Sequence, residues 1–121
     1  MMPTGTPYNQ RNIVLAPFTF SDLSAKKQRP VLIISNEEYN RNNDDFLCCA
    51  ITSNPREYHQ SLEILPKDME EGNLQFISRI KPGKLHTISK GIILRKIGKL
   101  SKNKSREVVK NLDVLISIDE P

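Results

Sequence analysis

The chain has 121 residues, of which 37% are hydrophobic and 26% charged, and its formal net charge is +4. This length makes one domain of ordinary size, which excludes a TIM barrel, a kinase and any two-domain enzyme with a hinged cleft. No apolar run approaches the roughly 20 residues that cross a bilayer, and residues 1–7 lack the pattern of a secretory signal. We therefore expect a cytoplasmic protein with no membrane partner.

The N-terminal part of the chain predicts an arm and then a strand. Residues 1–12 are polar and include two prolines, so we expect a flexible N-terminal arm ahead of a single domain over residues 13–117. The apolar run 13–18 predicts a short strand that is edged by Pro17, since proline cannot donate to a neighbouring strand.

A polar loop and a buried strand follow. Residues 19–28 predict a loop, which ends where Pro30 favours extended backbone at Arg29. Residues 31–35 are mostly branched apolar residues and predict a fully buried strand. The stretch 36–45 is rich in Asn, Glu and Asp and predicts a loop with one helical turn.

The middle of the chain predicts further short strands. Residues 46–51 form a third apolar run, and residues 52–55 have the composition of a turn. Residues 61–64 alternate as a half-buried strand does. Residues 67–73 predict an acidic loop that closes at Gly72.

Two more strands are predicted before the C-terminal region. Residues 74–80 and 87–97 are the candidates, separated by a turn at Pro82 and Gly83, and Gly98 is expected to break the second.

A helix is predicted at the end of the domain. From Ser101, a typical N-cap residue, the apolar period becomes that of a helix. Short strands followed by one closing helix indicate a small β-barrel or an open sheet with a helical cap. The apolar face of the helix consists of Val108, Val109, Leu112, Leu115 and Ile116.

The two cysteines, Cys48 and Cys49, are adjacent in a predicted strand. Neighbours on a strand point to opposite faces, so this pair cannot form an ordinary disulfide. With His59 and His86 distant in sequence, the thiols do not match the spacing of a zinc site, and we expect no metal. We expect one thiol in the core and the other nearer the surface.

The net charge of +4 hides an uneven distribution. Residues 79–110 contain eleven Lys and Arg and one acidic residue, Glu107, for a net charge of +10. The segments 1–78 and 111–121 each have a net charge of −3. The basic segment suggests a polyanionic partner, because neutralising phosphates releases counterions. The alternative is a solvated basic face of a helix and two strands.

Five segments, in this order, resemble the MazF/PemK family of toxins. An apolar strand with a Pro-Phe-x-Phe-Ser-Asp loop occupies 13–24, and an Arg-Pro pair leads into a buried strand at 27–35. A strand that ends in Ile-Thr-Ser at 51–53, a Gly…Ser…Thr-Ile stretch within 72–88 and Ile-Gly-Lys-Leu-Ser at 97–101 complete the series. Each motif is common by itself, whereas five in the family's order are specific.

The resemblance implies a mainly β fold with α-helix, namely an SH3-like small β-barrel of the CcdB/MazF/PemK type with a C-terminal helix, usually as a homodimer. It implies a cytoplasmic toxin of a type II toxin–antitoxin system, neutralised by a cognate antitoxin protein. Most members are endoribonucleases that cleave single-stranded RNA at short mRNA sequences without a metal or other cofactor. The 2′-hydroxyl of the substrate attacks the adjacent phosphate.

The resemblance also implies which residues form the site. Arg29 and Thr52 match catalytic residues of the family: a guanidinium suits the charged phosphorane, and a hydroxyl can donate to a phosphate oxygen. Substrate contacts are expected from Ser24, Lys27, Ser53, Arg79, Lys81 and His86.

The chain departs from the family pattern at three places. Where the family has Arg-Thr-Ile-Asp, this chain has His86-Thr87-Ile88-Ser89. Several members have a carboxylate shortly before that motif, at a position where this chain has Gly83. The Gly-Asp or Gly-Glu that usually starts the first strand is replaced by Arg11-Asn12. The general base is therefore open, and His86 is a candidate for proton transfer.

The alternative function is a non-catalytic barrel of the same fold that binds nucleic acid or a protein target. Gyrase poisons of this fold end in Trp-Gly-Ile, and this chain has no Trp.

Overall fold

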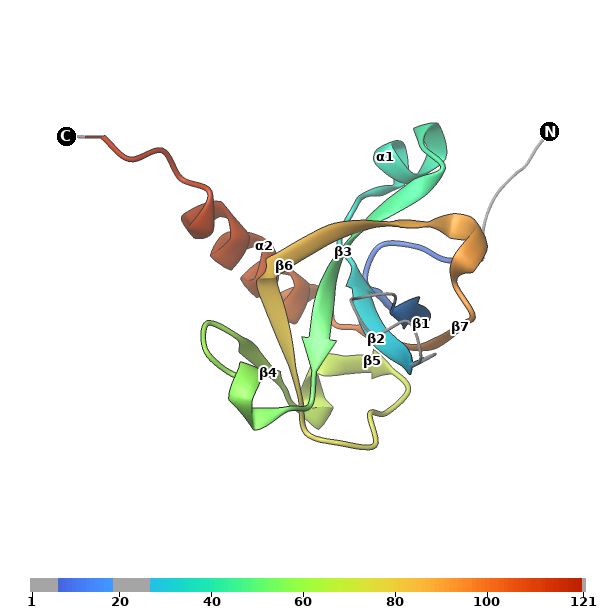
Figure 1. Ribbon diagram of the computed structural model, residues 1–121, viewed down its shortest axis with the longest axis horizontal. Coiled ribbons are helices and arrows are strands. Elements are labelled where there is room, and N and C mark those ends of the chain that lie inside the picture. The colour runs from blue at the N-terminus through green and yellow to red at the C-terminus, as the bar shows by residue number, and fades with distance from the viewer. Residues whose placement is uncertain (1–6, 19–26, 121) are drawn as a thin grey trace.

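Seven short strands and two α-helices follow one another within residues 7–18 and 27–120, the part of the chain that the structure, a computed structural model, describes (Figure 1). The strands are β1 (Asn12–Phe18), β2 (Lys27–Ile33), β3 (Asp45–Thr52), β4 (Leu62–Ile64), β5 (Met69–Glu71), β6 (Ser78–Ser89) and β7 (Arg95–Leu100). The helices are α1 (Glu37–Asn42) and α2 (Lys102–Leu115), and the 3-10 turns are η1 (Pro55–Glu57), η2 (Pro66–Asp68) and η3 (Lys90–Ile92).

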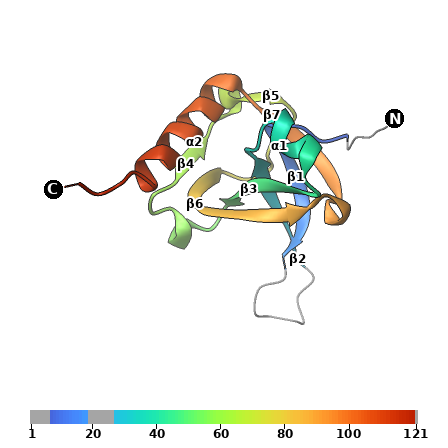
Figure 2. The same cartoon turned by 90° about the horizontal axis from the view of Figure 1, so that it is seen from above.

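These strands form one antiparallel sheet in the order β4-β6-β3-β2-β1-β7-β5. The sheet curves round into a nearly closed barrel, and α2 packs against β6 (Figure 1, Figure 2). The predicted mainly β barrel with a C-terminal helix is confirmed, in preference to an open sheet. In the described part of the chain, no helix is long and apolar enough to span a membrane.

Both faces of the central strands are covered by apolar side chains. On β2, Leu32 packs in a cluster that includes Val108 of α2. Its neighbours Val31 and Ile33 point the other way and pack around Phe46 of β3. The uninterrupted apolar run of β2 is therefore explained by burial on both sides.

The two cysteine side chains show that both faces of β3 are buried as well. Cys48 and Cys49 lie in different clusters, and both are completely buried and unpaired as a disulfide. The expectation that one thiol lies nearer the surface is wrong, because β3 has no solvent-facing side at this point. Burial raises the pKa of both thiols to about 12.

The C-terminal helix begins where the sequence predicts. The Ser101 hydroxyl accepts a hydrogen bond from the backbone N–H of Lys104 at 3.1 Å and caps α2. On the predicted apolar face only Val108 is buried, whereas Val109 and Ile116 are 43% and 66% exposed. The barrel thus covers this face only in part.

Two positions at which the sequence predicts the end of a strand lie inside strands. Pro82 and Gly83 lie within β6, where Ala50 pairs with Lys81 and Cys49 with Leu85, so that residues 82–84 form a bulge. A bulge accommodates a proline, which lacks the N–H of the ladder.

Gly98 likewise lies inside β7 rather than after it. A Cβ at Gly98 would stand 2.8 Å from the carbonyl oxygen of Glu71, so the glycine allows β5 to approach closely. Residues 67–73, which the sequence predicts as an acidic loop, thus contain the strand β5.

The segment before β1 is fastened to the barrel. The N–H of Arg11 donates to the carbonyl of Ile33 at 2.9 Å, and its own carbonyl accepts from the N–H of Leu100 at 2.8 Å. The strand starts at Asn12, which is buried. Residues 1–6 of the expected arm lie outside the described residues, and the division into arm and domain stays a prediction.

Candidate active site

Arg29 lies on the wall shared by two open grooves. The first has a volume of about 420 Å³, and we call it the Thr52 groove. The second has a volume of about 540 Å³, and we call it the Phe76 groove. The Thr52 groove is lined by Arg29, Pro30, Val31, Ala50, Ile51, Thr52, Glu57, Lys81, Gly83, Lys84, Leu85 and His86. The Phe76 groove is lined by Leu15, Gln28, Arg29, Pro30, Ile51, Ser53, Asn73, Leu74, Gln75, Phe76, Ser78, Arg95 and Ile97.

The strand register explains why distant residues meet in the Thr52 groove. Val31 of β2 pairs with Ala50 of β3, and Ala50 pairs with Lys81 of β6. Arg29 and Thr52 each lie two residues beyond the pair of Val31 and Ala50 on these antiparallel strands, and both line the groove. Pairing of three strands thus gathers groups that are more than fifty residues apart in sequence.

The hydroxyl of Thr52 already has a donor and an acceptor partner. Its side chain is 5% exposed, and Oγ1 donates to Oε2 of Glu57 at 2.7 Å. The same oxygen accepts the backbone N–H of Asn54 at 3.0 Å. Because a hydroxyl has one proton, Thr52 directs that proton at Glu57 rather than into the open groove.

Glu57 is held by a short, well-capped turn. Pro55 starts η1, the side chain of Asn54 caps it by accepting from the N–H of Arg56 at 3.1 Å, and the N–H of Glu57 donates to the carbonyl of Asn54 at 2.9 Å. The carboxylate therefore stands beside the end of β3 in a defined position.

His86 lies on the β6 wall of the Thr52 groove. Its Nδ1 is 3.0 Å from the carbonyl oxygen of Lys84. A carbonyl only accepts, so Nδ1 carries the hydrogen and Nε2 is the nitrogen that can exchange protons with a ligand.

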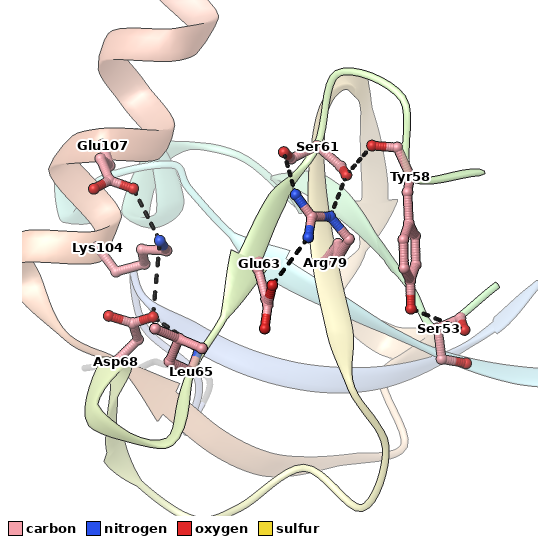
Figure 3. A network of polar contacts seen from close by, with 9 residues as sticks. All are labelled: Ser53, Tyr58, Ser61, Glu63, Leu65, Asp68, Arg79, Lys104 and Glu107. Carbon is pink, nitrogen blue, oxygen red and sulfur yellow. Dashed lines mark hydrogen bonds and ion pairs between the residues drawn. The ribbon is translucent and has the colours of Figure 1, made fainter. Parts of the chain in front are cut away.

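Arg79 lies outside both grooves. Its guanidinium donates to Oγ of Ser61 at 2.6 Å, to the carbonyl of Ser61 at 3.1 Å and to Oε1 of Glu63 at 3.2 Å (Figure 3). It also lies 5.1 Å from the centre of the Tyr58 ring. Arg79 thus fastens β4 and the loop before it to β6.

The acidic segment partly neutralises the basic one. Glu70 binds Arg11 at 2.9 Å and Lys99 at 3.3 Å, and Glu71 binds Lys96 at 2.8 Å. These cations lower the pKa of both carboxyl groups.

A second ion-pair cluster lies between η2 and α2. Lys104 lies between Asp68 and Glu107 (Figure 3). Among the described residues, Lys81, Lys84 and Arg95 form no ion pair, and all three line the grooves. Part of the positive charge that remains is therefore at the grooves, while Lys102, Arg106 and Lys110 lie elsewhere, on α2.

The structure brings most of the predicted site residues together. Arg29, Thr52, Lys81 and His86 line the Thr52 groove, and Ser53 lines the adjoining groove. Ser24 and the side chain of Lys27 lie outside the described part of the chain. No group of three or more His, Cys, Asp or Glu in that part could hold a metal ion.

Glu57, Phe76 and Arg95 also line the grooves, although none of them was predicted from the sequence. Glu57 carries no motif, and only its place in a proline-led turn five residues after Thr52 could have drawn attention to it. Phe76 is an exposed aromatic residue next to an exposed Ile77, a pattern that favours a contact surface.

A comparison with protein-family models identifies one family. Residues 9–116 match the family model described as PemK-like, MazF-like toxin of type II toxin–antitoxin system. No curated protein matches the chain.

Solved structures of low sequence identity share the fold. An endoribonuclease in complex with its cognate antitoxin from a mycobacterial species has a TM-score of 0.73 at 15% identity, over 94% of this chain and 99% of that one. A MazE–MazF structure from Deinococcus radiodurans has a TM-score of 0.71 at 18% identity, over 93% and 98%. The Mycobacterium tuberculosis toxin MazF-mt6 has a TM-score of 0.68 at 22% identity, over 91% and 100%.

Proposed function

Since the chain belongs to the PemK-like, MazF-like toxins of type II toxin–antitoxin systems, we propose that it is a metal-independent, sequence-specific endoribonuclease that cleaves single-stranded RNA. The main support is the convergence of Arg29, Thr52 and His86 with Lys81 and Lys84 in one groove. Phosphodiester cleavage without a metal requires proton transfer and stabilisation of a charged phosphorane, which an imidazole and cations can provide.

The proposed reaction uses the 2′-hydroxyl of the substrate as nucleophile. Its oxygen bonds to the adjacent phosphorus, the bond from phosphorus to the 5′-oxygen breaks, and the products have a cyclic phosphate and a free 5′-hydroxyl. Arg29 stabilises the phosphorane, since a guanidinium matches two phosphate oxygens. His86 in its protonated form donates from Nε2 to the leaving oxygen.

The Phe76 groove is the proposed site of a nucleotide next to the cleaved bond. Phe76, 70% exposed, offers a face on which an unpaired base can stack. Asn73, Gln75 and Ser53 offer amide and hydroxyl groups to base edges, and Arg95 offers a cation to a phosphate. Because Arg29 belongs to both grooves, RNA lying along them passes the proposed catalytic groups.

We also propose the partners that the family implies. A cognate antitoxin is supported by the mycobacterial relative, which was solved with one. A homodimer is supported by the apolar end of α2, where Val114 and Ile116 are exposed. Ser24 and Lys27 stay predicted substrate contacts, and the cytoplasm stays the predicted location.

The experiment that tests this function is cleavage of a defined single-stranded RNA by the purified protein in EDTA. Cleavage should leave a cyclic phosphate and a 5′-hydroxyl, and a single 2′-deoxy substitution at the cut site should abolish it. Cleavage of an all-deoxy substrate, or an absolute need for Mg²⁺, would contradict the mechanism.

A non-catalytic binding protein of the same fold is the second candidate. It is favoured by one observation: the Thr52 proton is directed at Glu57, not at the groove. Growth arrest on expression with intact RNA would support this candidate over the nuclease.

A further inference from the structure

Glu57 is the one carboxylate among the described residues that line the Thr52 groove. The other ionisable groups of that lining are Arg29 from β2 and Lys81, Lys84 and His86 from β6, all cationic or able to become so. A single carboxylate thus faces several cationic groups and one imidazole across one open groove.

The geometry of Glu57 is that of a fixed group with one oxygen available. Oε2 accepts the Thr52 hydroxyl at 2.7 Å, and the backbone is held in η1 by Pro55 and the Asn54 cap. The other oxygen, Oε1, takes no hydrogen bond or ion pair from the described residues. Thr52 itself is held in turn by the N–H of Asn54.

A purely structural role explains this arrangement less well. The turn is already closed by backbone bonds and the Asn54 cap, so it does not need a carboxylate. Glu70, Glu71 and Asp68, which lie outside the Thr52 groove, each pair with a cation. In the described part of the chain, Glu57 pairs with none.

We propose that Glu57 is the general base of the cleavage reaction, an inference that rests on the function proposed above. Oε1 takes the proton from the 2′-hydroxyl as that oxygen bonds to phosphorus. The leaving 5′-oxygen takes a proton from His86, and the two side chains exchange their protons with water afterwards. Thr52 is then a positioning residue, which orients the carboxylate through Oε2.

The test compares wild type with Glu57→Gln, Glu57→Asp and the control Glu38→Gln, an exposed carboxylate on α1 outside both grooves. The rate is measured across a pH series on one RNA, and affinity is measured on the same RNA with a 2′-deoxy group at the cut site. Glu57→Gln should lower the rate a hundredfold or more, bind the deoxy-substituted RNA as well as wild type, and lose the acidic limb of the pH profile. Glu38→Gln should match wild type.

A double substitution distinguishes a Thr52 that acts through Glu57 from a Thr52 that contacts the substrate itself. If Thr52 acts through Glu57, Thr52→Val should lower the rate, but adding it to Glu57→Gln should cause little further loss. If Thr52 contacts the phosphate independently, the two losses should multiply, which would overturn its positioning role.

The remaining outcomes also decide the matter. Glu57→Gln that cleaves within threefold of wild type, or that keeps the acidic limb, overturns the proposal while the nuclease function stands. If Glu57→Gln does not fold, the Glu57→Asp variant provides the test. Glu57→Asp should cleave at a reduced rate and keep the acidic limb of the pH profile. A Glu57→Asp variant without that limb would count against the proposal. Wild type that cleaves no RNA refutes the function and this inference together.

Discussion

The hydroxyl of Thr52 donates to the carboxylate of Glu57 across 2.7 Å, at the point where β3 ends and η1 begins. This contact bears on the predicted catalytic role of Thr52, which stays a prediction. We predicted a hydroxyl that donates to a phosphate oxygen, whereas its one proton is directed at Glu57. The bond also brings a carboxylate into a groove where Gly83 provides none.

Arg29→Ala should remove most of the cleavage activity. Loss of a group that stabilises charge in the transition state costs about a hundred- to a thousandfold in rate. Arg29→Lys should not recover it, because an ammonium cannot bind two phosphate oxygens in a fork. Arg41→Ala, which removes an exposed arginine of α1, is the control, and cleavage assays in EDTA check all three. An Arg29→Ala enzyme with wild-type activity would exclude Arg29 from catalysis.

Phe76→Ala should weaken substrate binding more than it slows chemistry. Stacking of one base on an aromatic ring contributes about 1–3 kcal/mol, so KM should rise while kcat changes less. Phe76→Tyr keeps the ring and should behave as wild type. Ile118→Ala, which shortens another exposed apolar side chain, serves as the control. Equal losses for Phe76→Ala and Ile118→Ala would argue against a stacking site.

Arg79→Ala should lower stability and leave the two grooves in place. The side chain donates three hydrogen bonds to Ser61 and Glu63, and loss of such partly buried contacts costs about 1–3 kcal/mol. Urea unfolding at fixed pH measures this. RNA affinity of the folded variant should be little changed, which would set aside the sequence-based expectation that Arg79 contacts substrate. A large loss of affinity at unchanged stability would restore it.

Alkaline pH should destabilise the fold through the buried thiols. Burial raises the pKa of Cys48 and Cys49 from 9.0 to about 12, so the folded chain holds protons that the unfolded chain releases. Their contribution to stability is fully present below about pH 9 and falls as the pH rises towards 12. Replacing both with Ala should flatten this alkaline decline in a series of urea titrations.

The same burial predicts low thiol reactivity. Neither thiol should react with a maleimide at pH 7.5 in the folded protein, and both should react in urea. Rapid labelling of the native protein would show that one face of β3 opens.

Local features of the sequence determined much of the fold. The apolar run 31–35 predicted β2, and Ser101 predicted the start of α2, because these signals act within a few residues. The Arg29-Pro30 pair and the Thr52 strand end likewise marked two residues that line the Thr52 groove.

Other features were decided only by tertiary contacts. Gly98 looked like a strand break until β5 came to lie against it, and Pro82 looked like a turn until a bulge in β6 accommodated it. Cys48 and Cys49 are both buried because apolar side chains cover both faces of β3.

The chain by itself determined a small basic domain with several of its strands, its closing helix and a charge of +10 over residues 79–110. Only the tertiary structure decided which of those charges matter for a ligand, because ion pairs form between segments distant in sequence. The acidic segment around Glu70 and Glu71 pairs with Lys96 and Lys99. The barrel places Lys81, Lys84 and Arg95 at the grooves and Lys102, Arg106 and Lys110 on α2, away from them. The same folding put Glu57 beside Thr52, a neighbourhood that depends on the turn between them and that no spacing rule encodes.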